Sequence, residues 1–332
     1  MQPRGPAPHK SGRLLKSTGC YPLRCVSWKE TLRTLIATVR REQSDPGGGI
    51  TETLGRSPDA HAGAPVWERR YKRIRDLDEG GMGRVLLAER GSDSVPVCLK
   101  FLSAGTDRRT AEQECRALMR LRHPAIVSLL DFSLQDEPPW LATEYIRGST
   151  LQTWLKTNKI PPLDVFVAIL KQILNALVYA HSEGVIHRDL KPANMMIESN
   201  GSELRVRILD FGIAIVDEFD HLGNLTGSGA DPLGTLLYMA PEQLKGEMLT
   251  PACDIYAVGL IAWEMLMGRS VFEGKTRSQM MFEKVTRAEG FPIERPPAAV
   301  PANLKSAIER CTLCEPAARP AAGELLAALP SL

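Results

Sequence analysis

Five polar residues lie within eight positions of one another in the stretch GVIHRDLKPANMMI, residues 184–197: His187, Arg188, Asp189, Lys191 and Asn194. Apolar residues flank them on both sides, and such flanks are normally buried. A carboxylate, an ammonium and an amide in one place are groups that proton transfer, charge neutralisation and metal binding require. We therefore interpret the stretch as a catalytic loop. Short strands or helices are expected to hold its ends while the polar side chains project into a cleft.

Further motifs accompany this loop in a fixed order. Along the chain they are DLDEGGMGRV (residues 76–85), VCLK ending at Lys100, Glu114 in a helical stretch, DFG (210–212) and APE (240–242). One such motif alone is a weak signal, but a chance match of the whole ordered set is negligible.

Together with the loop, these motifs resemble a protein kinase catalytic domain. The sequence is most similar to the bacterial serine/threonine kinases of the eukaryotic-like type, for which EGGMGRV, HRDLKPAN, DFGIA and YMAPEQ are characteristic. The resemblance covers about residues 70 to 330. It implies an α+β, two-lobed protein kinase-like fold, with a small β-rich N-lobe containing one helix and a larger, mainly α-helical C-lobe.

The resemblance also implies phosphoryl transfer, in which the protein mainly positions groups and neutralises charge. Asp189 is expected to accept or orient the proton of the substrate hydroxyl, and Lys191 to lie beside the transferred γ-phosphate. Thr235 resembles the threonine that hydrogen-bonds the catalytic Asp and Lys in serine/threonine kinases. Asn194 and Asp210 are expected to bind Mg²⁺, which prefers oxygen ligands. The implied cofactors are ATP and Mg²⁺.

The ATP site is implied by a larger set of matches. Side chains at Gly80 and Gly83 would block the approach of backbone N–H groups to the phosphates. Lys100 is expected to reach the α- and β-phosphates and to form an ion pair with Glu114. The hinge that follows Thr143 is expected to bind adenine through its backbone. The complete set is Leu77, Gly80, Gly81, Gly83, Val85, Cys98, Lys100, Glu114, Thr143, Glu144, Ile146 and Met196.

Other matches imply structural roles. Asp254 is expected to brace the catalytic loop, and Glu242 to form a buried ion pair with Arg319. A stack that links the two lobes is expected from Leu118, Leu129, His187 and Phe211.

The implied acceptors are Ser and Thr hydroxyls of protein substrates, because Thr235 is typical of serine/threonine kinases. Autophosphorylation is expected at Thr226 or Ser228, with Arg188 pairing with the phosphate, and this implies self-association. Ile215 stands where many relatives have a basic residue, which leaves the phosphate pocket one charge short.

Two other functions compete with this one. A pseudokinase that binds nucleotide or partners is the main alternative, and its only support is Asp78 at the first glycine position of the Gly-rich loop. Such proteins usually lose one of five residues that are all present here, namely Lys100, Glu114, Asp189, Asn194 and Asp210. A small-molecule kinase is the third candidate, and the APE motif argues against it.

Hydrophobic periodicity predicts the elements of the N-lobe. Apolar residues alternate from Val85 to Phe101 between turn residues, which indicates three antiparallel strands joined by hairpins. IVSLLDF and PPWLATEY indicate two more strands, and RRTAEQECRALMRLRH before them indicates a helix.

The second half of the chain is predicted to be mostly helical. DVFVAILKQILNALVYAHSEG indicates a helix that ends at Gly184. IYAVGLIAWEMLMG indicates a buried core helix, and Asn200-Gly201 is a strong hairpin signal. The apolar face of the first helix is predicted to consist of Phe166, Leu170, Ile173, Leu174, Leu177 and Val178.

Composition bounds the remaining possibilities. The chain has 332 residues, 43% of them hydrophobic, which is enough for a sizeable core. Its net charge of +2 conceals a basic segment, because residues 1–65 are net positive and the rest net negative. This segment is rich in Pro, Gly, Ser and Arg, so we expect a mostly disordered extension at 1–65 and a kinase domain at 66–332. The N-lobe is expected at about residues 66–146 and the C-lobe at about 147–332.

The seven cysteines show no disulfide framework spacing, and no secretory signal is recognisable. These features predict reduced thiols in a cytoplasmic protein. Cys311 and Cys314 have no second pair to complete a zinc site and are expected to lie together on an amphipathic helix. Neither a membrane anchor nor a nucleic-acid partner is predicted.

Asp78 yields the first testable prediction. Its carboxylate near the nucleotide should repel the phosphates, so Asp78→Gly is expected to lower the KM for ATP in steady-state kinetics. An unchanged KM would refute this effect of Asp78.

Overall fold

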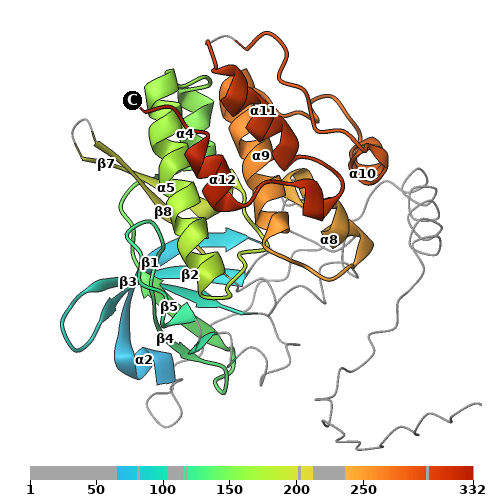
Figure 1. Cartoon of the computed structure of the whole chain (residues 1–332). Coiled ribbons are helices and arrows are strands. Elements are labelled where there is room, and N and C mark those ends of the chain that lie inside the picture. Colours follow the sequence, from blue (N-terminus) through green and yellow to red (C-terminus); the bar gives the residue numbers. More distant parts are fainter. Residues whose placement is uncertain are drawn as a thin grey trace, which may run out of the picture. The chain divides into compact units, whose positions relative to one another are not determined.

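The computed structural model describes residues 66–80, 83–102, 112, 115, 116, 118–200, 203–211, 236–296 and 299–331. These residues form two lobes, the first built on an antiparallel sheet and the second mainly helical (Figure 1). They all belong to one unit of the chain, residues 52–332. The predicted α+β, two-lobed architecture is confirmed, whereas the predicted extension at 1–65 lies outside the described residues.

Five antiparallel strands form the N-lobe sheet in the order β1-β2-β3-β5-β4. The strands that the alternation of apolar residues predicted are all present. The elements of this lobe are the short helix α2 (Val66–Arg70) and the strands β1 (Tyr71–Gly80), β2 (Gly83–Arg90), β3 (Pro96–Phe101), β4 (Leu129–Ser133) and β5 (Trp140–Glu144).

Burial alternates along β3, as it must in a strand with one face in a core. Val97, Leu99 and Phe101 are buried in the N-lobe core, whereas Cys98 and Lys100 point to the opposite face. The period of two thus separates the residues that stabilise the sheet from those available for a site.

The helix predicted between β3 and β4 is described only in part. Residues 112, 115, 116 and 118 are helical, and the backbone N–H of Met119 donates to Cys115 O at 2.9 Å. Glu114 lies outside the described residues.

The C-lobe is mainly helical, as predicted, with a small antiparallel sheet in the order β6-β7-β8. A hairpin joins β7 and β8 as predicted, but Asn200 is the last residue of β7 and pairs with Glu203, so it belongs to the strand and not to the predicted two-residue turn. The elements are β6 (Ser149–Thr150), α4 (Leu151–Thr157), α5 (Leu163–Ser182), η1 (Pro192–Asn194), β7 (Met195–Asn200), β8 (Glu203–Ile208), α8 (Pro241–Lys245), α9 (Ala252–Met267), α10 (Arg277–Thr286), α11 (Ala302–Cys311), η2 (Pro316–Ala318) and α12 (Ala322–Ala327).

Helix α5 buries its predicted apolar face against β8, α9 and α12 (Figure 1). Gly184 follows its end with a φ of 74°, which confirms the predicted stop. Val178 was wrongly placed in the buried face, because it lies at the edge of the stripe beside an open cavity and is 40% exposed. By length and composition α5 could cross a membrane, but half of its apolar window is buried in the lobe, as in a core helix.

Helix α9 is buried along nearly its whole length, as predicted for a core helix. It approaches α11 closely at Gly259, where a Cβ atom would lie 2.6 Å from Cys311 Cβ and 2.9 Å from Thr312 Cγ2. Glycine is needed here because any side chain would separate the two helices.

Cys311 and Cys314 do not share a helix, which corrects the prediction. Helix α11 ends at Cys311, and Cys314 lies beyond it. The Thr312 hydroxyl donates to Glu309 O at 2.9 Å and accepts from the backbone N–H of Phe291 at 2.8 Å. These bonds involve the residue that caps the helix, directly after Cys311.

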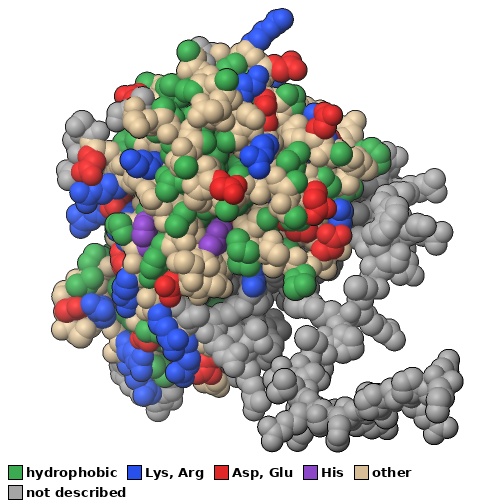
Figure 2. Space-filling model, in the orientation of Figure 1, with side chains coloured by type: hydrophobic (Ala, Val, Ile, Leu, Met, Phe, Trp, Pro, Cys, Tyr) green, Lys and Arg blue, Asp and Glu red, His purple; other side chains and the backbone are tan. Residues whose placement is uncertain are grey.

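Lys and Arg side chains gather over the part of the N-lobe that contains α2 and β1 (Figure 2). Arg69, Lys72, Arg73 and Arg75 are all exposed there. The described chain thus has a basic surface of its own, although residues 66–332 are net negative as a whole.

Gly259 and Gly323 provide a matched pair of stability variants. Gly259→Ala should lower the free energy of unfolding by about 1–3 kcal/mol through overpacking between α9 and α11. Gly323→Ala on α12, where an added Cβ meets nothing within 4 Å, should be neutral or slightly stabilising. Urea unfolding of both variants checks this, and equal effects would contradict the close approach of the two helices.

Candidate active site

The catalytic loop is held by one buried carboxylate on α9. Asp254 Oδ2 accepts the backbone N–H of His187 at 2.9 Å, and Oδ1 accepts that of Arg188 at 2.8 Å. Arg188 has a φ of 70°, a left-handed conformation that costs free energy for a residue with a Cβ. The predicted bracing role of Asp254 is therefore confirmed, and it stabilises a strained backbone directly before Asp189.

His187 is fully buried and has a structural role. Its Nε2 lies 2.8 Å from Leu209 O, which can only accept, so Nε2 carries the proton. Its Nδ1 accepts the backbone N–H of Asp189 at 3.3 Å. The ring packs against Phe211 with 4.7 Å between centroids, as predicted. Both ring nitrogens are thus engaged by backbone groups, one in the loop itself and one directly after β8.

Asp189, Lys191 and Asn194 form one hydrogen-bonded group. Lys191 Nζ lies 2.8 Å from Asp189 Oδ2. Asn194 Nδ2 donates to the same oxygen at 3.0 Å and to Asp189 O at 2.9 Å. The turn of η1 brings Asn194 back toward Asp189, since the Asn194 N–H donates to Lys191 O. The structure thus brings together three side chains that the sequence analysis assigned to one catalytic loop.

Asp210 joins this group to the N-lobe sheet. Lys100 Nζ on β3 donates to Asp210 Oδ2 at 3.0 Å. Burial alone would raise the pKa of the Asp210 carboxyl, but the charge and hydrogen bond of Lys100 outweigh it and hold this pKa below its usual value. Asp210 is therefore ionised at neutral pH.

Two oxygens in this group suit a hard metal ion. Asn194 turns its NH₂ toward Asp189, which leaves its Oδ1 free of donors among the described residues. Asp210 Oδ1 likewise receives no hydrogen bond from a described residue. An amide oxygen and an ionised carboxylate are ligands that Mg²⁺ prefers, so the donor set fits this ion.

The predicted residues of the Gly-rich turn that the structure describes, and Val85 of the predicted adenine site, lie on β1 and β2. Gly80 pairs with Gly83 across the turn between β1 and β2, and Val85 lies opposite Lys100. Leu77 is half-buried on β1. The side chains of Gly-rich-loop residues 78–83 are not among those described, and Gly81 lies outside the described residues altogether.

The predicted adenine-binding residues come from β3, β5 and β7. Cys98 pairs with Thr143, and both lie on the same sheet as Lys100. Burial raises the pKa of the Cys98 thiol to about 11, so this cysteine is not a thiolate at neutral pH. Met196 is half-buried on β7, and Ile146 is buried after β5.

Glu144 directs its side chain away from a nucleotide-binding role. Its Oε1 accepts the Ser128 N–H at 3.2 Å, and Oε2 pairs with Arg207 on β8. Only the backbone of Glu144 is therefore suited to the predicted contact with adenine. This ion pair between the hinge and β8 was not predicted, because no sequence motif marks it.

The remaining structural predictions are confirmed. Arg319 pairs with both carboxylate oxygens of Glu242, at 2.6 and 2.8 Å, and both residues are buried. Leu118, Leu129 and Phe211 line one small cavity together. Glu114, Thr226, Ser228, Ile215 and Thr235 lie outside the described residues.

Gln243 is a site neighbour that the sequence analysis missed. Its Nε2 donates to Arg188 O at 2.7 Å, and its Oε1 accepts the Ala240 N–H at 2.9 Å. A Gln three residues after a helix N-cap is a capping signal that could have identified the second contact but not the first.

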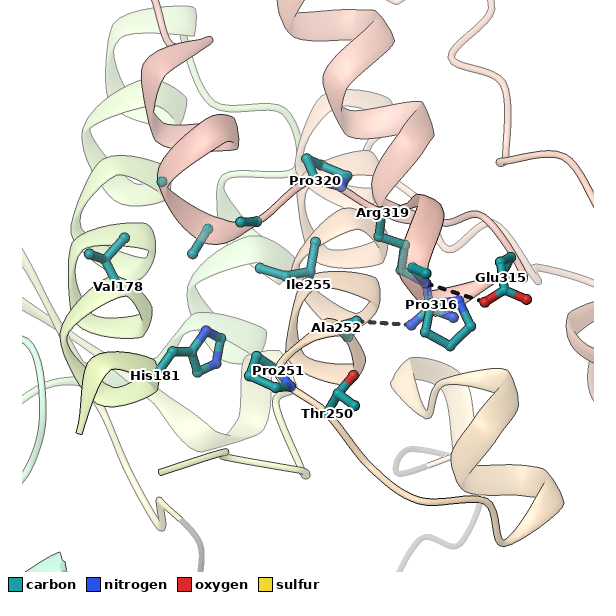
Figure 3. A pocket seen from close by; sticks show the side chains of 14 residues that line it. Val178, His181, Thr250, Pro251, Ala252, Ile255, Glu315, Pro316, Arg319 and Pro320 are labelled. Atoms are coloured by element: carbon teal, nitrogen blue, oxygen red, sulfur yellow. Dashed lines mark hydrogen bonds between the residues drawn. The ribbon is translucent and has the colours of Figure 1, made fainter. Parts of the chain in front are cut away.

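A cavity of about 730 Å³ lies apart from this group, between α5, α9 and the segment from η2 to α12 (Figure 3). Its lining is mostly Ala, Pro, Val and Ile. His181 lines it and contacts Asp254 Oδ2 at 2.8 Å. The wall of this cavity therefore reaches the carboxylate that holds the catalytic loop.

The two lobes, the Lys100–Asp210 pair and the group of Asp189, Lys191 and Asn194 together are typical of one protein family. The chain belongs to the protein kinase family, because the protein kinase domain model matches residues 71–329. Its β3 lysine, catalytic loop and DFG aspartate are arranged as the motifs predicted.

Particular relatives are named bacterial kinases. The chain is similar to the serine/threonine-protein kinase pkn3 of Myxococcus xanthus (38% identity, 75% of this chain, 47% of the relative). It is also similar to the serine/threonine-protein kinase PrkC of Bacillus subtilis, with 31% identity over 74% of this chain and 38% of the relative. The serine/threonine-protein kinase PkaA of Streptomyces coelicolor is 32% identical over 83% of this chain and 48% of the relative. The chain thus spans less than half the length of these relatives.

The Lys100–Asp210 pair predicts a pH dependence. A carboxyl whose pKa is lowered in the folded state contributes stability above its ordinary value of 3.8 and loses it as the pH falls through the folded-state pKa. At pH about 6 the free energy of unfolding should therefore be higher for wild type than for Lys100→Met, and this difference should shrink toward pH about 3.

Denaturant unfolding at several pH values checks this prediction. Lys171→Met, at an exposed position of α5, is the control and should show no such pH-dependent difference. If the difference in free energy of unfolding between wild type and Lys100→Met stays constant from neutral to acid pH, the link between the Asp210 pKa and stability is contradicted.

Proposed function

We propose that the chain is an ATP- and Mg²⁺-dependent protein kinase that phosphorylates Ser and Thr hydroxyls of proteins, itself included. The observation that supports this most is the hydrogen-bonded group of Asp189, Lys191 and Asn194 beside the Lys100–Asp210 pair. The printed names of the relatives support Ser and Thr as acceptors.

Asp189 is suited to the acceptor hydroxyl. Its Oδ2 is occupied by Lys191 and Asn194, which leaves Oδ1 without a donor among the described residues. In the proposed step Oδ1 orients the hydroxyl and takes its proton. The hydroxyl oxygen forms a bond to the γ-phosphorus while the bond to the β–γ bridging oxygen breaks, and ADP leaves with that electron pair.

The lysines supply positive charge on both sides of the reaction. Lys191 is buried, so its ammonium acts in a low dielectric, where it neutralises charge on the transferred group more strongly than in water. Lys100 binds the α- and β-phosphates and, in the proposed active state, pairs with Glu114.

Asn194 and Asp210 would hold Mg²⁺ through Asn194 Oδ1 and Asp210 Oδ1, which receive no hydrogen bond from a described residue. The bound ion would neutralise phosphate charge that otherwise repels the attacking oxygen. Asp210 can serve only when ionised, and Lys100 lowers its pKa to keep it so.

Further residues of the proposed site lie outside the part of the chain that the structure describes. Gly81 completes the phosphate-binding turn, Thr235 hydrogen-bonds the catalytic group, and Thr226 or Ser228 receives the phosphate in autophosphorylation. Residues 66–332 form the kinase domain in this proposal.

We also propose that the protein acts in the cytoplasm on protein substrates. Thiols support a reducing compartment, and among the described residues Cys98, Cys253, Cys311 and Cys314 form no disulfide.

Transfer of labelled γ-phosphate from MgATP tests the proposal. Wild type should label both itself and myelin basic protein, and Asp189→Asn should lower this rate about 10²–10⁴-fold. The matched control is Asp164→Asn, an exposed residue in the first turn of α5, which should keep the wild-type rate. A folded wild type that binds ATP but transfers no phosphate would favour the pseudokinase.

A further inference from the structure

A buried lysine on α10 holds the segment that precedes α8. Lys284 is 1% exposed, and its Nζ donates to Leu237 O at 2.8 Å and to Met239 O at 2.7 Å. These bonds fix the backbone on both sides of Tyr238. The predicted motifs gave no role to this residue.

The surroundings of Lys284 lack the usual partner of a buried ammonium. No carboxylate pairs with it in the described part of the chain, and burial lowers the pKa of its amine well below the usual value. Its Nζ instead lies 5.3 Å from the ring centroid of Tyr256 and 4.9 Å from that of Phe272. Charged or neutral, the amine keeps N–H groups for both carbonyls, so the two bonds persist in either state.

The held segment lies beside the catalytic loop. Gln243, at the start of α8, donates to Arg188 O at 2.7 Å, one residue before Asp189. Leu237 and Met239 are only half-buried, whereas the Tyr238 hydroxyl bonds to Glu264. Gln243 also accepts the N–H of Ala240, so it ties the end of this segment to the loop. A polypeptide that brings a hydroxyl to Asp189 would therefore lie close to this segment.

Other contacts secure the neighbourhood but not this backbone. Tyr238 bonds to Glu264 through its side chain, and Glu242 pairs with Arg319 farther along. Among the described residues, Lys284 alone donates to the carbonyls of Leu237 and Met239. Without it, two partly buried carbonyl acceptors lose their partner, and the backbone of residues 237–239 loses the contacts that fix its conformation.

We propose that Lys284 is a positioning residue for the protein substrate, which holds the backbone of residues 237–239 in the conformation on which the acceptor polypeptide docks. The inference rests on the proposed kinase function. It concerns binding of the polypeptide and leaves ATP binding and the chemical step unaffected.

Steady-state kinetics of Lys284→Met test this role, with myelin basic protein as the acceptor. The variant should raise the KM for this protein about tenfold or more. The KM for ATP and the rate of ATP hydrolysis to water without acceptor should stay within about twofold of wild type. A purely structural role would instead lower hydrolysis and transfer together.

Lys275→Met is the matched control, because Lys275 also contacts α10, through Glu283, but is partly exposed and, among the described residues, donates to neither Leu237 O nor Met239 O. It should leave the KM for myelin basic protein unchanged. If Lys284→Met does not fold, Lys284→Gln is measured, whose shorter amide should still raise this KM about threefold or more.

The outcomes separate the two proposals. An unchanged acceptor KM in a folded Lys284 variant, or an equal loss of hydrolysis and transfer, overturns the role of Lys284 alone. Absence of any transfer by wild type overturns the kinase function on which that role rests.

Discussion

The site depends on one buried carboxylate, that of Asp254. It lies in the first turn of α9, where the helix dipole stabilises negative charge, and two backbone N–H groups and His181 share its oxygens. Because α9 is buried along its length, it gives the catalytic loop a rigid point of attachment. The left-handed backbone of Arg188 can persist only while these bonds hold it.

A second constraint is the period of two along β3. It places Lys100 on the face opposite the N-lobe core, and the ion pair with Asp210 then connects that sheet to the loop region of the C-lobe. The polar groups of the two lobes are thus joined by a charge pair, whereas each lobe is stabilised by its own apolar core. Because of this division, Lys100 and Asp210 can exchange their charged partners without disturbing the apolar core of either lobe.

The sequence predicted most of the fold and the positions of the central site residues, because motif order and hydrophobic periodicity are local signals. It failed where tertiary neighbours decide. Val178 belongs to the helical stripe of α5, yet no element of the described residues covers it. The helix before Cys314 ends where the Thr312 hydroxyl donates to Glu309 O. Lys284 could not be distinguished from a surface lysine, since its burial depends on aromatic rings distant in the chain.

The exposed cations of β1 have a consequence for how copies of the protein meet. Strand β1 is at the edge of its sheet, and an edge strand can pair with a strand of another molecule. Lys72, Arg73 and Arg75 are exposed there, so two β1 strands brought together would oppose like charges. The first strand of the N-lobe therefore disfavours edge-to-edge pairing of two copies of the sheet.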